Sequence, residues 1–235
     1  MKILAIDTTS GACSVALLDG DAVSEQFVQA ERDHTRRLLP MVDSILAEGE
    51  CKLSEIDALA VSRGPGSFTG LRIAVSCVQG LAFAADKPVV PVSSLAALAS
   101  GARRVSPGWG SSPVVAALDA RMQEVYWGVY GGGDPANSLV EESVSAPEQL
   151  VTALQSGQVM AAGAAWYAAG PGWHYPGLAP LSPTETVQEF HVHAQDIGRL
   201  ALELWQRGEM VSAEALEPAY LRNEVTWKKR QRIRQ

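Results

Sequence analysis

Cysteine is scarce in this sequence, and no metal-binding spacing accompanies it. The three cysteines among 235 residues are Cys13, Cys51 and Cys77, and no two of them form a CxxC pair. An odd number of distant cysteines gives neither a disulfide framework nor a zinc site. His191 and His193 alternate along an extended segment, but two histidines alone make a poor metal site. We therefore expect buried thiols in a reducing cytosol and no metal of the protein's own.

Long apolar runs are also missing. The apolar run before Asp7 is shorter than the roughly 7–15 residues of a signal-peptide core. The longest apolar segment, Ile73–Ala85, is interrupted by Ser76 and Gln79 and is shorter than the roughly 20 residues of a membrane helix. We therefore expect a cytoplasmic protein with no membrane partner.

Positive charge is scarce outside the C-terminal end. The chain has 26 acidic and 19 basic residues, a formal net charge of −7, yet residues 220–235 contain six basic residues and one acid. The acidic body argues against binding of nucleic acid by a broad basic surface. It leaves open an anionic partner, or a tail that meets one. We expect the start of the tail to pack on the fold and Lys228–Arg234 to be a solvated end.

The apolar patterning instead predicts alternating strands and helices. The Asp19-Gly20-Asp21 turn between two apolar runs is a strong hairpin signal, so the chain opens as a three-stranded meander. The expected strands are Lys2–Asp7, Cys13–Leu18, Ala22–Val28, Ala58–Ser62, Pro88–Val92, Val114–Leu118, Glu124–Tyr130, Leu139–Val144 and Gln158–Ala162. The expected helices are His34–Glu48, Thr69–Ala85, one capped by Ser93 or Ser94, one from Pro147 to near Gly157, and His193–Arg207.

The order of these elements repeats once along the chain. The Pro-, Gly- and Ser-rich stretch Arg103–Pro113 has little to bury and marks a domain boundary. We expect a first lobe over residues 1–105 and a smaller second lobe over residues 106–235, whose C-terminal helix and basic tail pack back toward the first lobe. The stretch Ala164–Pro183 is expected to be irregular. Mixed sheets covered by helices, twice over, predict an α/β, two-lobed fold of the actin/sugar-kinase/Hsp70 (ASKHA) type.

The first segment with chemical potential follows the first strand. Asp7 ends that strand, and Thr8, Thr9, Ser10 and Gly11 form the turn after it. Hydroxyls and backbone N–H groups in such a turn can donate to phosphate, and Asp7 can orient a metal-bound water. The alternative is a hairpin turn in which Asp7 caps backbone amides.

The second segment is a glycine-rich loop that opens the long helix near residue 69. The loop is not a Walker loop, because no Lys follows its last Gly, and it is not the dinucleotide-binding GxGxxG loop. Its glycines let the backbone approach a ligand or a neighbouring chain, and the helix N-terminus favours anions. The alternative is a capping turn with Ser67 or Thr69 as N-cap. The candidate residues are Gly64, Gly66, Ser67, Thr69, Gly70 and Arg72.

A third segment, at the start of the second lobe, is the counterpart of the first. Asp119 ends a predicted strand, but Arg121 stands where the first lobe has small hydroxyl residues. A guanidinium at this place fits a fixed ion pair or a phosphate contact, not a turn that wraps phosphate. A GxSxG elbow is also absent, so the sequence offers no convincing nucleophile or base.

Over nearly its whole length, the chain resembles the TsaB (YeaZ) family. The matching motifs are MKILAIDTTSGACSVAL, HTRRLLPMV, SRGPGSFTGLRIAVSCVQGLAFA, LDARMQEVYWGVY and PAYLRNEVTWKK. The resemblance implies a role in the threonylcarbamoyl modification of adenosine 37 in tRNA (t6A), beside the paralogous transferase TsaD, and it implies the same two-lobed fold.

Departures from TsaD point away from catalysis. TsaD enzymes bind a metal through an N-H-L-x-G-H motif, and in the matching stretch Ser94 and Leu98 stand where the two imidazoles would be. Neither side chain replaces an imidazole at a metal centre. Gly163-Ala164-Ala165 is the nearest match to the adenosine-binding turn. We expect a non-catalytic subunit; the alternatives are an ASKHA-type ATPase or phosphotransferase acting alone and, less favoured, a metalloprotease.

The resemblance also implies partners. A TsaB pairs with TsaD through its first lobe, a TsaE-type ATPase joins with ATP or ADP at the junction, and alone the protein forms a homodimer through much the same face. tRNA is then contacted indirectly, through the complex. We expect the partner face on helices His34–Glu48 and Thr69–Ala85, and its candidate residues are Leu38, Val42, Ile45, Val75 and Val78.

Overall fold

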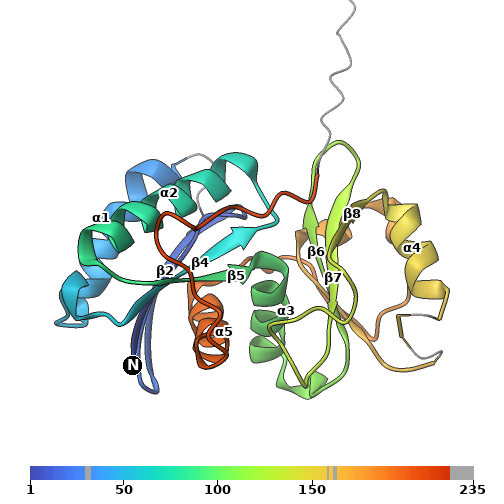
Figure 1. Cartoon of the computed structure of the whole chain (residues 1–235). Coiled ribbons are helices and arrows are strands. Elements are labelled where there is room, and N and C mark those ends of the chain that lie inside the picture. Colours follow the sequence, from blue (N-terminus) through green and yellow to red (C-terminus); the bar gives the residue numbers. More distant parts are fainter. Residues whose placement is uncertain (30–32, 158, 161–162, 223–235) are drawn as a thin grey trace, which may run out of the picture.

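The computed structural model describes residues 1–29, 33–157, 159–160 and 163–222, which form two five-stranded sheets and the helices around them (Figure 1). The strands are β1 (Lys2–Asp7), β2 (Ala12–Asp19), β3 (Ala22–Gln29), β4 (Ala58–Gly64), β5 (Val89–Ser93), β6 (Val114–Asp119), β7 (Val125–Tyr130), β8 (Ser143–Ser145), β9 (Tyr167–Ala169) and β10 (Glu185–Val187). The α-helices are α1 (His34–Glu48), α2 (Phe68–Ala85), α3 (Ser94–Val105), α4 (Pro147–Gln155) and α5 (Ala194–Gln206). Short 3₁₀ turns are η1 (Leu53–Glu55), η2 (Pro107–Trp109), η3 (Pro171–His174) and η4 (Pro176–Leu178).

The first sheet has the strand order β3-β2-β1-β4-β5. The pairs β1–β2 and β2–β3 are antiparallel, as expected of a meander, whereas β4 and β5 run parallel to β1 and to each other. Gly20 supplies the positive φ that the β2–β3 turn requires. Because β1 and β4 are parallel, their carboxyl ends lie side by side, and Asp7 therefore comes next to the loop that follows Gly64.

Helices cover both faces of the first sheet. On one face, Leu4 and Ile6 belong to a core with α1 and α2; on the other, Ile3 and Ala5 belong to a core with α3 and α5. The second sheet, β10-β9-β6-β7-β8, packs α3 on one face and α4 on the other. Figure 1 shows α3 and α5 between the two sheets. Helix α5, the last helix among the described residues, thus covers the sheet formed by the strands β1 to β5.

The segment predicted as a domain boundary is largely structured. Arg103 lies within α3 and donates hydrogen bonds to the carbonyl oxygens of Ser112, Tyr130 and Gly131. Trp109 is buried and stacks on the ring of Tyr167. The prediction that this stretch buries little was wrong, because Trp109 belongs to the core between the sheets.

The strand predicted over Leu139–Val144 is shorter and begins later, as β8. The preceding segment leaves the sheet because Glu142 turns inward and accepts hydrogen bonds from Ser93 and Tyr130. Ser138 replaces part of the lost pairing, since its hydroxyl bonds to the N–H and the carbonyl oxygen of Val129.

The strand predicted over Gln158–Ala162 is not found in its described part. Val159 and Met160 form a bend, and residues 158, 161 and 162 lie outside the described residues. On the side of β6 away from β7, the paired strand is instead β9, within the stretch predicted to be irregular. Gly170 follows it with φ +101°, and a Cβ there would lie 2.5 Å from the Ala117 carbonyl oxygen. The glycines that suggested irregular chain thus allow β9 and the following turn to pack closely against β6.

Candidate functional site

Asp7 is buried at the carboxyl end of β1, and most of its hydrogen-bond partners are local. Its Oδ1 accepts from the Thr9 N–H at 3.1 Å, the Thr9 hydroxyl at 2.5 Å and the Ser62 hydroxyl. Its Oδ2 has no partner among the described residues. Burial raises the pKa of Asp7 to about 6, against the hydrogen bonds from Ser62 and Thr9, which lower it. The carboxyl is therefore a buried acid that titrates near neutral pH.

The glycine-rich loop packs directly on the turn after Asp7. The Ser67 N–H donates to the Thr9 carbonyl oxygen at 2.8 Å, and the Thr8 hydroxyl donates to the Gly70 carbonyl oxygen at 2.6 Å. Ser67 is the N-cap of α2 and accepts from the Gly70 N–H. A Cβ on Gly66 would lie 2.6 Å from the Thr9 carbonyl oxygen, so the glycine accommodates the chain itself.

These contacts bring together two of the three predicted segments and occupy their donors. The hydroxyls of Thr8 and Thr9 bond within the protein, as the hairpin-turn alternative expects. The Ser10 hydroxyl is buried with no partner among the described residues. The arrangement is a closed contact between loop and turn, and it supplies few free donors for a phosphate.

The third segment has its own partners in the second lobe. Asp119 Oδ1 accepts from the Arg121 N–H at 2.8 Å and from the Tyr175 hydroxyl at 2.7 Å, and the Arg121 guanidinium lies 3.2 Å from Asp119 Oδ2. Within the described ranges, no hydrogen bond or ion pair joins Asp119 or Arg121 to Asp7. The sequence left a fixed ion pair and a phosphate contact open for Arg121, and the structure contains the ion pair.

The positions that correspond to metal ligands in TsaD lie in α3. Ser94 and Leu98 are fully buried, and Leu98 belongs to the core between the sheets. His193 pairs with Glu25 at 2.9 Å and stacks on Phe27, whereas burial lowers the pKa of His191. The described part of the chain contains no group of three or more His, Cys, Asp or Glu residues placed to hold a metal ion.

The residues predicted as the partner face lie in the core. Each is at most 5% exposed, and all belong to the cluster between α1, α2 and the first sheet: Leu38, Val42, Ile45, Val75 and Val78. Burial removes Val42, Ile45, Val75 and Val78 from a docking face, whereas Leu38 also lines the groove described below. Helical periodicity of apolar residues marks the face that packs on the sheet, and a docking face needs apolar residues outside that stripe.

Such residues are present on the outer side of the same two helices. Leu39 is 52% exposed, Phe68 58% and Phe83 74%. Between α1 and α2 lies an apolar groove with a volume of about 760 Å³. Its lining residues are Thr35, Leu38, Leu39, Phe68, Thr69, Arg72, Ile73, Ser76, Cys77, Gly80 and Leu81. In the sequence, the signal for this groove is that α2 has more apolar residues than the face that packs on the sheet can hold.

That excess also appears in the composition of α2. By length and apolar composition, α2 matches a membrane-spanning helix, contrary to the expectation that apolar segments fall well short of this length. One face of α2, with Leu71, Ala74 and Val78, packs into the core of the first lobe. The exposed apolar residues therefore lie on the outside of a helix that belongs to a folded lobe.

The segment Leu216–Arg222, here called the C-terminal strap, crosses the outside of both lobes (Figure 1). Its Leu216 carbonyl oxygen accepts from Gln79 of α2 at 3.0 Å, and the Ala219 N–H donates to the Arg63 carbonyl oxygen at 2.7 Å. At its end, Arg222 forms an ion pair with Glu124 of the second lobe. Residues Lys228–Arg234 lie outside the described residues.

Comparisons with known proteins agree on one family. A family model described as TsaD, tRNA N6-adenosine threonylcarbamoyltransferase, matches residues 28–181. The chain is 41% identical to the tRNA threonylcarbamoyladenosine biosynthesis protein TsaB of Escherichia coli, over 97% of this chain and 98% of that protein. It is 39% identical to the TsaB of Haemophilus influenzae, over 97% of both chains. The solved structure of YeaZ from Pseudomonas aeruginosa is 43% identical, with a TM-score of 0.84, over 94% of this chain and 99% of that one.

Proposed function

Because the chain belongs to the TsaB (YeaZ) family and has its two-lobed ASKHA-like fold, we propose that it is a non-catalytic subunit that pairs with and activates a TsaD-type transferase. It takes part in tRNA threonylcarbamoyladenosine biosynthesis. The observation that supports this proposal best is the exposed apolar groove between α1 and α2. In the turn after β1, the hydroxyls of Thr8 and Thr9 form hydrogen bonds within the protein. We place the protein in the cytoplasm, where it meets tRNA through its partner.

The contacts around Asp7 support a role without catalysis. The loop Gly64–Gly70 and the turn Thr8–Thr9 bond to each other, which leaves few donors to stabilise charge that develops on a substrate. Ser94 and Leu98 offer no imidazole for a metal. Activation of a partner then comes from binding rather than from chemistry within this chain.

The groove supports pairing through the first lobe. Exposed Leu and Phe side chains on a surface helix favour association, because a partner that covers them buries their apolar surface away from water. The family model that covers α1 and α2 is that of the TsaD transferase itself, so partner and subunit share this part of the fold. One face can therefore serve a heterodimer and, when the partner is absent, a homodimer of similar geometry.

We place ATP or ADP, together with a TsaE-type ATPase, at the junction of the assembled complex. The first lobe itself offers the nucleotide little, because the Gly70 and Leu71 N–H groups at the start of α2 already donate to Ser67. The acidic body of the chain leaves most of the tRNA contact to the partner.

Size-exclusion chromatography with light scattering tests the pairing. The wild-type chain, mixed with the TsaD homologue of its own organism, is expected to elute as a heterodimer. Leu39→Asp, which places a charge in the groove, is expected to abolish the complex. Leu139→Asp is the matched control, since Leu139 is 56% exposed on the second lobe and Leu39 52%. A Leu39→Asp variant that pairs as well as Leu139→Asp contradicts the proposed face.

Reconstitution of t6A formation tests the function itself. The TsaD homologue, with its other partners and tRNA, is expected to form little product without this chain and much more with it. Equal product in both reactions rules out an activating subunit.

A second candidate, an ATPase or phosphotransferase acting alone, is favoured by one observation. Asp7 Oδ2 is buried and has no partner among the described residues, as an acid awaiting a ligand would be. Isothermal titration of the isolated chain with ATP and Mg²⁺ separates the two candidates: tight binding together with turnover supports the enzyme, and heats equal to dilution support the subunit.

A further inference from the structure

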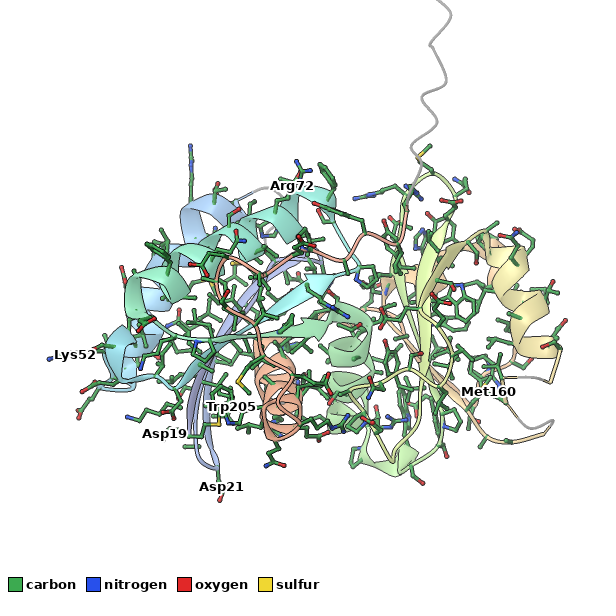
Figure 2. The ribbon with its side chains drawn as sticks, viewed as in Figure 1. Asp19, Asp21, Lys52, Arg72, Met160 and Trp205 are labelled. Atoms are coloured by element: carbon green, nitrogen blue, oxygen red, sulfur yellow. The ribbon has the colours of Figure 1, made fainter. Side chains whose placement is uncertain are left out.

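The guanidinium of Arg72 is held in one orientation at the edge of the groove. Its Cζ lies 3.9 Å from the centre of the Phe68 ring, and its Nε donates to the Tyr220 hydroxyl at 3.1 Å. The rings of Phe68 and Tyr220 are 5.8 Å apart. Figure 2 shows Arg72 at the outer edge of the first lobe, above the strap. Stacking on the Phe68 ring and the hydrogen bond from Nε to Tyr220 fix the plane of the guanidinium.

The other edge of this guanidinium is unused. Nη1 and Nη2 of Arg72 have no hydrogen-bond or ion-pair partner among the residues that the structure describes, and the side chain is exposed. Three other arginines of the chain have acidic partners: Arg37 with Asp33, Arg121 with Asp119 and Arg222 with Glu124. Arg72 therefore differs from them in offering a free, oriented pair of N–H donors.

Among the described residues that line the groove, Arg72 alone carries a charge. A protein that fills the groove removes water from this guanidinium, and a charge that loses water without gaining a partner opposes binding. The planar fork matches a carboxylate, which it binds through two parallel hydrogen bonds. The partner thus has to provide an acceptor at the end of the groove where α2 begins.

We propose that Arg72 anchors a carboxylate side chain of the protein that docks in the groove, and that Tyr220 of the strap positions Arg72 for it. The inference rests on the proposed function, since it specifies the chemistry of the docking partner. The docking element of the TsaD-type protein then combines an apolar stripe, which fills the groove, with an Asp or Glu at the end that faces Arg72.

A phosphate of a nucleotide is the other source of such an anion, and the surroundings favour the carboxylate. The Gly70 N–H and the Leu71 N–H at the start of α2 already donate to Ser67, so they are not available to a phosphate. The rest of the groove is lined mainly by apolar and small side chains. A protein side chain anchored at the rim of an apolar docking site fits this environment better than a multiply charged ligand.

Titration of the full-length chain against the TsaD homologue measures the anchor. Arg72→Gln is expected to raise the Kd about 10- to 100-fold, as truncation of an interface arginine does. Arg72→Lys keeps the charge but not the fork and is expected to fall between wild type and Arg72→Gln. Tyr220→Phe keeps the ring, loses the bond to Nε, and is expected to raise the Kd by about 3- to 10-fold. Arg63→Gln is the control, an exposed arginine outside the groove, and is expected to stay within about twofold.

Salt and nucleotide provide readouts that a merely structural role would not change. The wild-type Kd is expected to rise more steeply with NaCl concentration than the Arg72→Gln Kd, because the variant lacks the ion pair. Far-UV circular dichroism and thermal melting verify that each variant is folded. A loss of affinity that appears only in the presence of ATP and Mg²⁺ assigns the anion to the nucleotide and overturns the inference.

Failure of the inference is distinguishable from failure of the proposed function. If wild type binds and Leu39→Asp does not, while Arg72→Gln binds like Arg63→Gln, the groove docks the partner without a carboxylate anchor and the inference is wrong. If wild type itself does not bind the TsaD homologue, the proposed function falls, and the inference falls with it.

Discussion

Gly70 lies so close to Thr8 that a Cβ atom on Gly70 would come within 1.8 Å of the Thr8 carbonyl oxygen. The contact joins the start of α2 to the turn after β1, and the Thr8 hydroxyl closes it by donating to the Gly70 carbonyl oxygen. Backbone faces backbone here, so no side chain can rotate away to make room. The position of α2, and with it one wall of the groove, depends on this contact.

Gly70→Ala is expected to destabilise the protein by about 1–3 kcal/mol, because the added methyl group overpacks a site with no room. Gly80 provides the control on the same helix, since a Cβ there meets nothing within 4 Å. Gly80→Ala is expected to be neutral or to stabilise by about 0.5–1 kcal/mol, as alanine does within a helix. Urea unfolding compares the two, and equal free energies of unfolding would contradict the close contact.

Asp7→Asn is expected to remove the loss of stability that the wild-type protein undergoes as pH rises through 6. The folded-state pKa of about 6 exceeds the ordinary value of 3.8, so the fold holds the proton more tightly than the unfolded chain. The contribution of Asp7 to the free energy of unfolding is therefore fully present below about pH 4, and it is lost as pH rises through 6. The difference between the two pKa values corresponds to on the order of 3 kcal/mol.

The asparagine keeps an oxygen for Thr9 and Ser62 and removes the charge. Urea unfolding of both proteins from pH 4 to pH 8 measures the effect. The free energy of unfolding of the wild-type protein is expected to fall relative to that of Asp7→Asn as pH rises from 4 to 7. A constant difference across this range would argue against a buried, titrating Asp7.

Arg104→Met is expected to destabilise the protein by about 3–5 kcal/mol. Arg104 of α3 holds Asp196 of α5 through two hydrogen bonds of 2.8 Å, and the Asp196 side chain is 1% exposed. Removal of the arginine leaves a buried carboxylate without its partner. The double variant Arg104→Met/Asp196→Asn is expected to be more stable than Arg104→Met alone. Urea unfolding of the wild type, both single variants and the double variant gives a double-mutant cycle. If the changes in the free energy of unfolding simply add, the two residues do not interact.

Deletion of the residues after Trp227 is expected to leave pairing with the TsaD homologue unchanged. The removed segment is strongly basic, so any loss should appear in the affinity of the assembled complex for tRNA and grow as salt is lowered. Fluorescence anisotropy with labelled tRNA at several NaCl concentrations measures it. A loss of equal size at every salt concentration would count against an electrostatic contact.

The parts of the fold that local chemistry determines were predictable. The Asp19-Gly20-Asp21 turn predicted the β2–β3 hairpin, and Ser67 and Ser93 were among the expected helix caps, as the structure has them. The strand β9 was missed because its partner strand, not its own pattern, determines its conformation. Close packing of Gly170 against Ala117 is a tertiary requirement that composition does not reveal.

The sequence likewise predicted some features of the candidate site and missed others. Parallel β1 and β4 explain why the Asp7 turn and the Gly64 loop meet, although the sequence did not show that each would occupy the donors of the other. Periodicity selected Val42 and Val78 as a docking face, and the structure places both in the core. Tyr220 escaped notice because its contact with Arg72 joins residues 148 positions apart.

The position of α5 has a consequence for synthesis. Strands β1 and β2 are synthesised well before α5, which packs on one of their faces. Until residues 194–206 have been translated, that face has apolar side chains such as Ile3 and Leu18 without their final cover. The nascent first lobe therefore stays partly uncovered until the strands of the second sheet have been translated, and this is the interval in which a chaperone or an early partner has most to protect.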